Sequence, residues 1–116
     1  MEGAFLHEMS IAEGILDIVM QETAKSGGTD VKEIGILLGE LSGVETEALS
    51  FCWESIARGT VAAGAKLKIK RVPLTGRCYS CGNEQLIRNY NFVCQCGGQL
   101  EVVKGRELQV EYLEVD

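Results

Sequence analysis

Apolar and polar positions along the first part of this chain follow the period of an α-helix. The apolar residues recur at the three- and four-residue spacing of one helix face: Ala12, Ile15, Leu16 and Val19. Ser10 followed by Glu13 has the form of a capping box, which satisfies free backbone N–H groups at a helix start. Because a Gly-Gly pair follows, we predict a helix over residues 10–25.

A similar apolar stripe predicts a second helix. Its members follow the spacing i, i+3, i+4 and i+7: Leu49, Cys52, Trp53 and Ile56. Ser42 with Glu45 forms a second capping-box pattern ahead of the stripe, and Gly59 stops it. We interpret Cys52 as a buried small hydrophobic residue of this stripe, not as a metal ligand.

Three segments alternate with the two-residue period of β-strands, and a short fourth strand is expected at 99–103. Residues 31–38 gather apolar side chains on one face, 65–72 carry lysines opposite Leu and Ile, and 106–115 carry glutamates. Since opposite charges attract across paired strands, we expect 65–72 and 106–115 to be neighbours, with the residues between them inserted. The predicted fold class is α+β: two helices packed on a small mixed β-sheet, with an inserted β module that resembles a zinc ribbon.

The inserted module holds four of the five cysteines at the spacing of a metal site. Cys78 and Cys81 form a C-x-x-C pair, and Cys94 and Cys96 form a C-x-C pair after an excursion of twelve residues. Two such pairs, brought together by a hairpin, supply four thiolates to a closed, structural Zn²⁺ site. Iron in a rubredoxin-like site and a redox-active dithiol are the alternatives.

Composition and charge narrow the class of function. The formal net charge of −6 argues against nucleic acid as a partner, because phosphate contacts require clustered Lys and Arg. No apolar run approaches the ~18 residues that cross a membrane. No basic segment leads into a long apolar run at the N-terminus, so we expect a cytoplasmic protein with reduced thiols.

His7 is the only histidine of the chain. A single histidine near a terminus is by default a solvated surface residue. Glu8 adjoins it, however, and Glu40 and Glu45 flank the start of the second helix. Imidazole, carboxylate and backbone nitrogen donors together suit an exchangeable divalent ion such as Ni²⁺ or Cu²⁺. The alternative is that Glu8 and Glu45 only complement the positive ends of the two helices.

Several short segments together resemble the HypA/HybF family of nickel metallochaperones, which act in [NiFe]-hydrogenase maturation. The resemblance covers residues 7 to about 115 and rests on these segments: HEMS at 7–10, LGEL at 38–41, VE at 44–45, FCW at 51–53, GA at 64–65, the paired cysteines, and GREL at 105–108.

This resemblance implies a non-enzymatic protein with two domains. Residues 1–73 plus 105–116 would form a nickel-binding α/β domain, and residues 74–104 a zinc-binding domain. Nickel would be an exchangeable cargo held by His7 with backbone nitrogens around it, and we add Glu8 and Glu45 as candidate further ligands. Structural zinc would be held by the paired cysteines: Cys78, Cys81, Cys94 and Cys96.

The resemblance also implies partners for nickel delivery. These are a GTPase and the hydrogenase large subunit, with urease as a further client in some organisms. We expect a monomer or homodimer, without contact to nucleic acid or membrane. The alternative function is that of a zinc-ribbon module that binds a protein partner and carries no nickel.

Two features depart from the family pattern. The second cysteine pair is C-x-C, where the family usually has C-x-x-C. The family histidine directly follows the initiator methionine, whereas residues 1–6 precede His7 in this chain, so the amine of Met1 is displaced from the nickel site.

Overall fold

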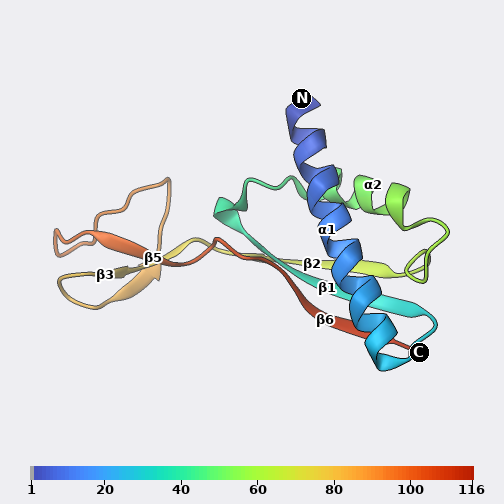
Figure 1. Cartoon of the computed structure of the whole chain (residues 1–116). Helices are drawn as coiled ribbons and strands as arrows, with labels where there is room; N and C mark the ends of the chain where they lie inside the picture. Colours follow the sequence, from blue (N-terminus) through green and yellow to red (C-terminus); the bar gives the residue numbers. More distant parts are fainter. Residues whose placement is uncertain (1) are drawn as a thin grey trace. The chain divides into compact units, whose positions relative to one another are not determined.

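The structure is a computed structural model that describes residues 2–116, with side chains described from His7 onward (Figure 1). In chain order its elements are α1 (Glu2–Ser26), β1 (Val31–Gly39), the 3₁₀ turn η1 (Glu40–Ser42), α2 (Thr46–Ala57), β2 (Lys66–Val72), β3 (Thr75–Cys78), β4 (Glu84–Leu86), β5 (Leu100–Lys104) and β6 (Leu108–Val115). They form two three-stranded sheets, so the predicted α+β class is confirmed. Neither described helix is long and apolar enough to span a membrane.

The chain divides into two compact units. The first, which we call the helical unit, comprises Met1–Leu37, Gly43–Lys70 and Gln109–Asp116, and the second, the cysteine unit, comprises Leu38–Ser42 and Arg71–Leu108. The sequence predicted a nickel-binding domain at 1–73 plus 105–116 and a zinc-binding domain at 74–104. This division stays a prediction, because it is defined by the metal that each part binds.

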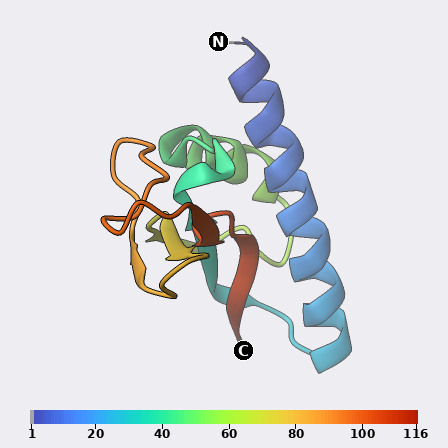
Figure 2. The ribbon, with the colours of Figure 1, turned by 90° about the vertical axis from the view of Figure 1, so that its left-hand side faces the viewer.

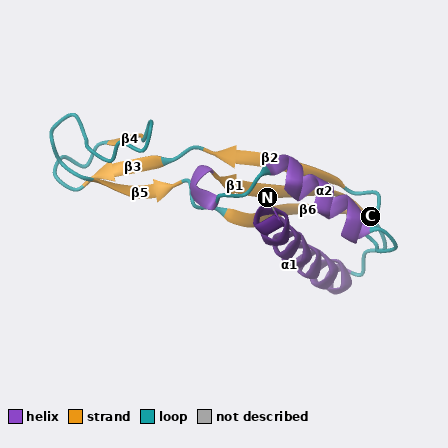
Figure 3. Ribbon diagram, turned by 90° about the horizontal axis from the view of Figure 1, so that it is seen from above, coloured by secondary structure: helices purple, strands orange, loops and turns teal. Residues whose placement is uncertain are grey.

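Helices α1 and α2 pack against each other and cover one face of the sheet β2-β1-β6 (Figures 2 and 3). The strands β1 and β2 run in the same direction and are joined through α2, as expected for a helical crossover. The core of this unit combines one stripe from each helix with the inward residues of β1: Ala12, Ile15, Val19, Leu49, Cys52, Trp53, Ile34 and Ile36. The prediction that Cys52 is buried is confirmed.

Helix α1 begins eight residues earlier than predicted. Ser10 is exposed in the middle of the helix, so the capping box with Glu13 is wrong. The preceding segment contains residues with high helix propensity, such as Ala4 and Leu6, and the helix therefore continues through it. At its other end α1 closes with a Schellman motif: Gly27 has φ 72°, and the N–H of Gly28 donates to the carbonyl of Thr23 at 3.1 Å.

Helix α2 also starts without the predicted capping box. Ser42 lies in η1, and Glu45 is itself the N-cap residue, whose side chain makes no capping hydrogen bond. The backbone N–H of Glu45 instead donates a hydrogen bond to a side chain of α1, as described below. Gly59, with φ 76°, follows the helix end as predicted.

The predicted adjacency of the lysine-bearing and glutamate-bearing strands is wrong. Strand β1 lies between β2 and β6, so the two charged strands form opposite edges of the sheet. The physical reason is burial: Ile34, Ile36 and Leu38 of β1 have no exposed surface, whereas the apolar residues of β2 are only half-buried. The most apolar strand takes the centre, where both of its edges are paired and water is excluded.

The cysteine unit contains the antiparallel sheet β4-β3-β5. Its small core consists of Leu74, Cys78, Ile87, Cys94 and Leu100, with Leu41, Phe92 and Val102 packed against them. Two of its five fully buried members are cysteines, so little apolar area stabilises this unit.

Candidate metal centres

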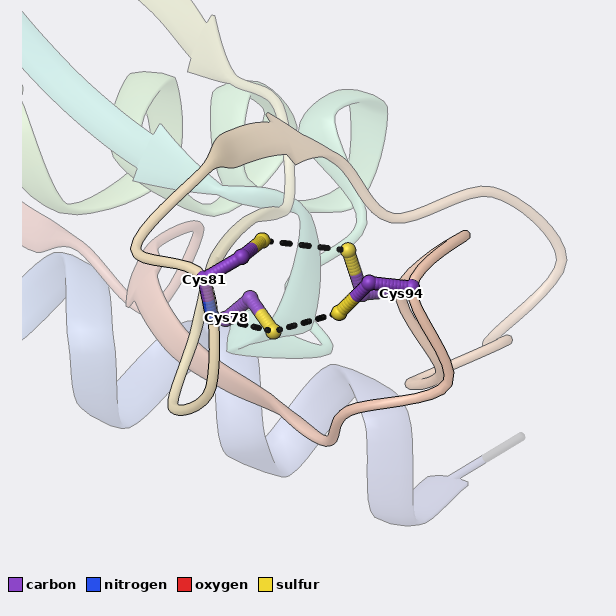
Figure 4. A group of neighbouring side chains, drawn as sticks. Cys78, Cys81 and Cys94 are labelled. Atoms are coloured by element: carbon purple, nitrogen blue, oxygen red, sulfur yellow. Dashed lines mark hydrogen bonds between the residues drawn. The ribbon is translucent and has the colours of Figure 1, made fainter.

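The four paired cysteines converge on one point in the cysteine unit (Figure 4). Cys78 ends β3 and Cys81 follows in the next turn, while Cys94 and Cys96 come from the turn that precedes β5. Their Sγ atoms all lie within 4.8 Å of one another. The Sγ of Cys78 is 3.5 Å from that of Cys96, and the Sγ of Cys81 is 3.7 Å from that of Cys94.

Each cysteine pair is held by a short turn that ends at a glycine. The N–H of Gly82 donates to the carbonyl of Cys78 at 2.9 Å, and the N–H of Gly97 donates to the carbonyl of Cys94 at 2.9 Å. Both glycines have positive φ, 74° and 92°, a conformation that glycine adopts without steric cost. The turn from Cys94 to Gly97 is one residue shorter than the turn from Cys78 to Gly82. A C-x-C pair can therefore direct both of its sulfurs to the same point as the C-x-x-C pair does.

The backbone stabilises negative charge on the sulfur of Cys78. The N–H groups of Cys81 and Ser80 point at this Sγ from 3.5 and 3.4 Å, and together they lower the pKa of Cys78 to about 6. For Cys96, the N–H of Gly98 lowers the pKa, but the neighbouring thiols outweigh it and raise the pKa to about 12. Sulfur atoms this close do not all ionise unless a cation neutralises them.

The donor set therefore fits a divalent cation with a preference for thiolate. Four sulfurs complete a tetrahedral shell and leave no coordination position for a substrate. In the part of the chain that the structure describes, no His, Asp or Glu belongs to this group, and Cys52 lies outside it. A metal ion bound by these four sulfurs would thus be structural in character.

A second group of polar atoms lies in the helical unit, where α1 meets the start of α2. The side chain of His7 is 54 % exposed, and its Nδ1 lies 4.0 Å from Oε1 of Glu8. The side chain of Glu8 is only 1 % exposed, and its Oε2 accepts a hydrogen bond from the backbone N–H of Glu45 at 2.6 Å. Its Oε1 is buried and has no hydrogen-bond partner among the described residues.

Glu8 thus caps α2 from another helix. Its carboxylate lies at the positive end of α2, where a negative charge is favourable. Its charge also reaches the core: burial, with Glu8 adding to it, raises the pKa of Cys52. The sequence suggested as an alternative that Glu8 complements a helix start, but not that it caps α2 from within α1, where it precedes Ala12 by four residues and so continues the apolar stripe.

The structure brings together some of the predicted nickel-site residues. The backbone N–H of Glu45 donates a hydrogen bond to Glu8, whereas the side chain of Glu45 is exposed. Glu40 lies in η1, within the cysteine unit. The amine of Met1 lies outside the described residues.

The sequence matches the model of a protein family described as hydrogenase/urease nickel incorporation, metallochaperone, hypA, over residues 6–115. The hydrogenase maturation factor HypA of Azotobacter chroococcum is 41 % identical over 113 residues, which cover 96 % of this chain and all of that protein. The factor HypA 2 of Bradyrhizobium diazoefficiens is 42 % identical over the same extent.

Two solved structures share the fold. The solution structure of the Ni metallochaperone HypA from Helicobacter pylori has a TM-score of 0.69 at 18 % identity, covering 93 % of this chain and 96 % of that one. A solution structure described as HypA protein has a TM-score of 0.74 at 18 % identity, covering 95 % and 96 %.

Proposed function

The chain belongs to the HypA family of nickel metallochaperones for hydrogenase maturation, which are not enzymes, and from this premise we propose where it holds its metals. Nickel is an exchangeable cargo at His7 and Glu8. Zinc is a structural ion on the four paired cysteines. The two sites differ in ligand chemistry. Nitrogen and oxygen ligands allow nickel to exchange, whereas four thiolates retain zinc.

Zinc at the cysteines is supported by the donor set. Four thiolates in a tetrahedral shell suit Zn²⁺, and the closed shell makes exchange slow. The backbone N–H groups aimed at Cys78 favour its thiolate form, which is the form that binds metal. Iron binds similar sets, so the identity of the metal is part of the proposal.

Nickel at His7 rests above all on Oε1 of Glu8, which has no hydrogen-bond partner among the described residues. A buried carboxylate oxygen without a partner is costly, and a cation beside it would remove that cost. The exposed imidazole of His7 lies 4.0 Å from this oxygen, so one ion can reach both atoms. Nitrogen and oxygen donors suit a divalent ion of borderline softness such as Ni²⁺. The carboxylate of Glu45 remains a candidate ligand, and water would complete the shell.

The helical state of α1 limits which backbone atoms can join this site. In a helix that begins at Glu2, the N–H groups of His7 and Glu8 are engaged with carbonyls one turn earlier. The backbone nitrogen ligands that the family resemblance implies therefore require the first turns of α1 to open. If only side chains bind nickel, the first turns of α1 can stay helical.

We further propose that the cargo passes to the hydrogenase large subunit with the help of a GTPase, in the cytoplasm. Urease is a second candidate client. The acidic character of the chain supports protein and cation partners over nucleic acid.

Metal content tests the proposal against a zinc-binding interaction module that carries no nickel. Elemental analysis of the full chain should give one tightly held zinc, plus one nickel after loading. His7→Ala should lose the nickel and keep the zinc, whereas Ser10→Ala, on the exposed surface of the same helix, should keep both. If the native chain takes up no nickel, or His7→Ala binds it equally well, the proposed cargo site is wrong.

A further inference from the structure

The first cysteine turn supplies hydrogen-bond donors to its own leading sulfur. The backbone N–H groups of Ser80 and Cys81, two and three residues after Cys78, donate to the Sγ of Cys78 at 3.4 and 3.5 Å. Donors of this kind offset part of the negative charge of a thiolate and hold it in place for a metal. The C-x-x-C half of the site is therefore supported from within its own turn.

The shorter second turn does not support Cys94 in the same way. The residues two and three positions after it are Cys96 and Gly97. The N–H of Gly97 closes the turn by donating to the carbonyl oxygen of Cys94 at 2.9 Å. Within the described part of the chain, no backbone N–H donates to the Sγ of Cys94, although this side chain is only 5 % exposed. A thiolate buried here needs a donor from elsewhere.

A side-chain amide from β4 lies against this sulfur. Gln85 is the middle residue of β4, which pairs with β3, and its side chain is half-buried. Its Oε1 accepts a hydrogen bond from the thiol of Cys94 at 3.7 Å and another from Nδ2 of Asn83 at 3.3 Å. Strand β4 thus brings to Cys94 a polar group from outside both cysteine turns.

The direction of this hydrogen bond depends on the state of the sulfur. A thiol can donate to Oε1 of Gln85, whereas a thiolate bound to a metal has no proton and can only accept. Half a turn about the last bond of the glutamine side chain places Nε2 where Oε1 lies. The second N–H of that nitrogen then faces Asn83, whose amide can turn in the same way and accept it.

We propose that Gln85 is a positioning residue of the zinc site, which donates a side-chain N–H to the thiolate of Cys94. It replaces the backbone donors that the shorter turn does not supply. The inference rests on the proposed zinc at the cysteines, where four thiolates carry more negative charge than one Zn²⁺ neutralises. Gln85 therefore contributes to metal affinity without touching the metal.

Two substitutions in the full chain test this role. Gln85→Leu removes the donor and should weaken zinc binding by roughly 10–100-fold, measured by competition with a chromophoric chelator. Gln85→Glu keeps the shape but offers only acceptors and a negative charge, so it should weaken binding at least as much. Gln99→Glu is the matched control, because it makes the same change at an exposed position of the same unit, and it should bind zinc like the native chain.

A spectroscopic measurement separates donation to sulfur from a merely space-filling role. With Co²⁺ in place of zinc, the cysteine site should show a sulfur-to-metal charge-transfer band. An N–H donor lowers the energy of the sulfur lone pairs, so its loss in Gln85→Leu should move the band to longer wavelength. The band of Gln99→Glu should not move.

Native zinc affinity in both Gln85 variants, or an unchanged band in Gln85→Leu, would overturn this inference and leave the proposed zinc site intact. A native chain that bound neither zinc nor Co²⁺ at the cysteines would overturn the proposed zinc site, and the role of Gln85 with it.

Discussion

Glu8 combines an observed role, the cap of α2, with a proposed role in nickel binding. One oxygen receives the N–H of Glu45 and so caps α2, and the other has no partner among the described residues and lies near His7. A buried carboxylate is stable only when its oxygens are hydrogen-bonded or neutralised. The first oxygen contributes to stability in the absence of cargo, and the second is the one that a cation would bind.

Two substitutions at Glu8 separate these roles. Glu8→Ala removes the cap and should lower the free energy of unfolding by ~1–2 kcal/mol, together with the affinity for nickel. Glu8→Gln keeps an oxygen for the N–H of Glu45 but loses the charge, so it should retain stability and still bind nickel more weakly. Urea denaturation and calorimetric nickel titration measure the two quantities. Wild-type nickel affinity in Glu8→Gln would show that this side chain is only a cap.

Gly98 is required by the packing of the cysteine site. A Cβ atom at this position would come within 2.7 Å of the Sγ of Cys78. Gly98→Ala should therefore displace that ligand and weaken zinc binding by roughly tenfold or more, measured by competition with a chromophoric chelator. Gly64→Ala is the matched control, because a Cβ atom there meets nothing within 4 Å. Equal zinc affinities in the two variants would contradict this account.

Among the residues of the candidate sites, the cysteines were predictable and the cap was not. Cys78, Cys81, Cys94 and Cys96 are close in sequence, and short turns alone set their spacing. The cap joins residues that are 37 positions apart, so it depends on how α1 and α2 pack. At α2, the local Ser-x-x-Glu pattern therefore predicted a capping box where a distant glutamate accepts the hydrogen bond instead.

At the scale of elements, the existence of the helices and strands followed from periodicity, whereas their ends and order did not. Helix α1 has the predicted apolar stripe but extends to Glu2, because residues 2–6 contain no proline that would end the helix. Strand order was decided by burial, and the charges of β2 and β6 were a weaker guide. Exposed charges remain solvated at either edge, but apolar residues on β1 require the centre.

The extension of α1 bears on nickel affinity. Removing residues 1–5 leaves the N–H groups of His7 and Glu8 in the first turn, where no intrahelical acceptor exists, and places the α-amine on Leu6. Opening the longer helix breaks backbone hydrogen bonds that each contribute about 0.5–1.5 kcal/mol, so we predict that the truncated form binds nickel more tightly.

Calorimetric titration of both forms at one pH, with His7→Ala in each as a control, measures this effect. Equal affinities would mean that neither the amine nor the backbone nitrogens are ligands. Weaker binding by the truncated form would mean that one of the removed residues is a nickel ligand, for which Glu2 is the candidate. The side chain of Glu2 lies outside the described residues.

At the scale of the whole molecule, the two units differ in what stabilises them. The helical unit has an extended apolar core, whereas the core of the cysteine unit includes two of the proposed metal ligands, Cys78 and Cys94. Metal binding contributes ~10–16 kcal/mol in small zinc peptides, which exceeds what so few apolar residues supply.

Removal of zinc should therefore unfold one unit and spare the other. In excess chelator, the amide NMR signals of β3 and β5 should lose their dispersion while those of β1 and α2 are retained. Cys78→Ser should give the same pattern without chelator. Dispersed signals from β3 and β5 in the metal-free chain would show that the cysteine unit folds without its ion.

If Glu8 binds nickel as proposed, its shared carboxylate would couple nickel binding to the anchoring of α2. If the ion held by one oxygen orders the side chain whose other oxygen caps α2, then occupancy strengthens the anchoring of that helix. By linkage, any change that strengthens the anchoring tightens the grip on the ion by the same factor. A client that loosens the start of α2 would then eject the cargo without touching it, so release would be driven by the recipient.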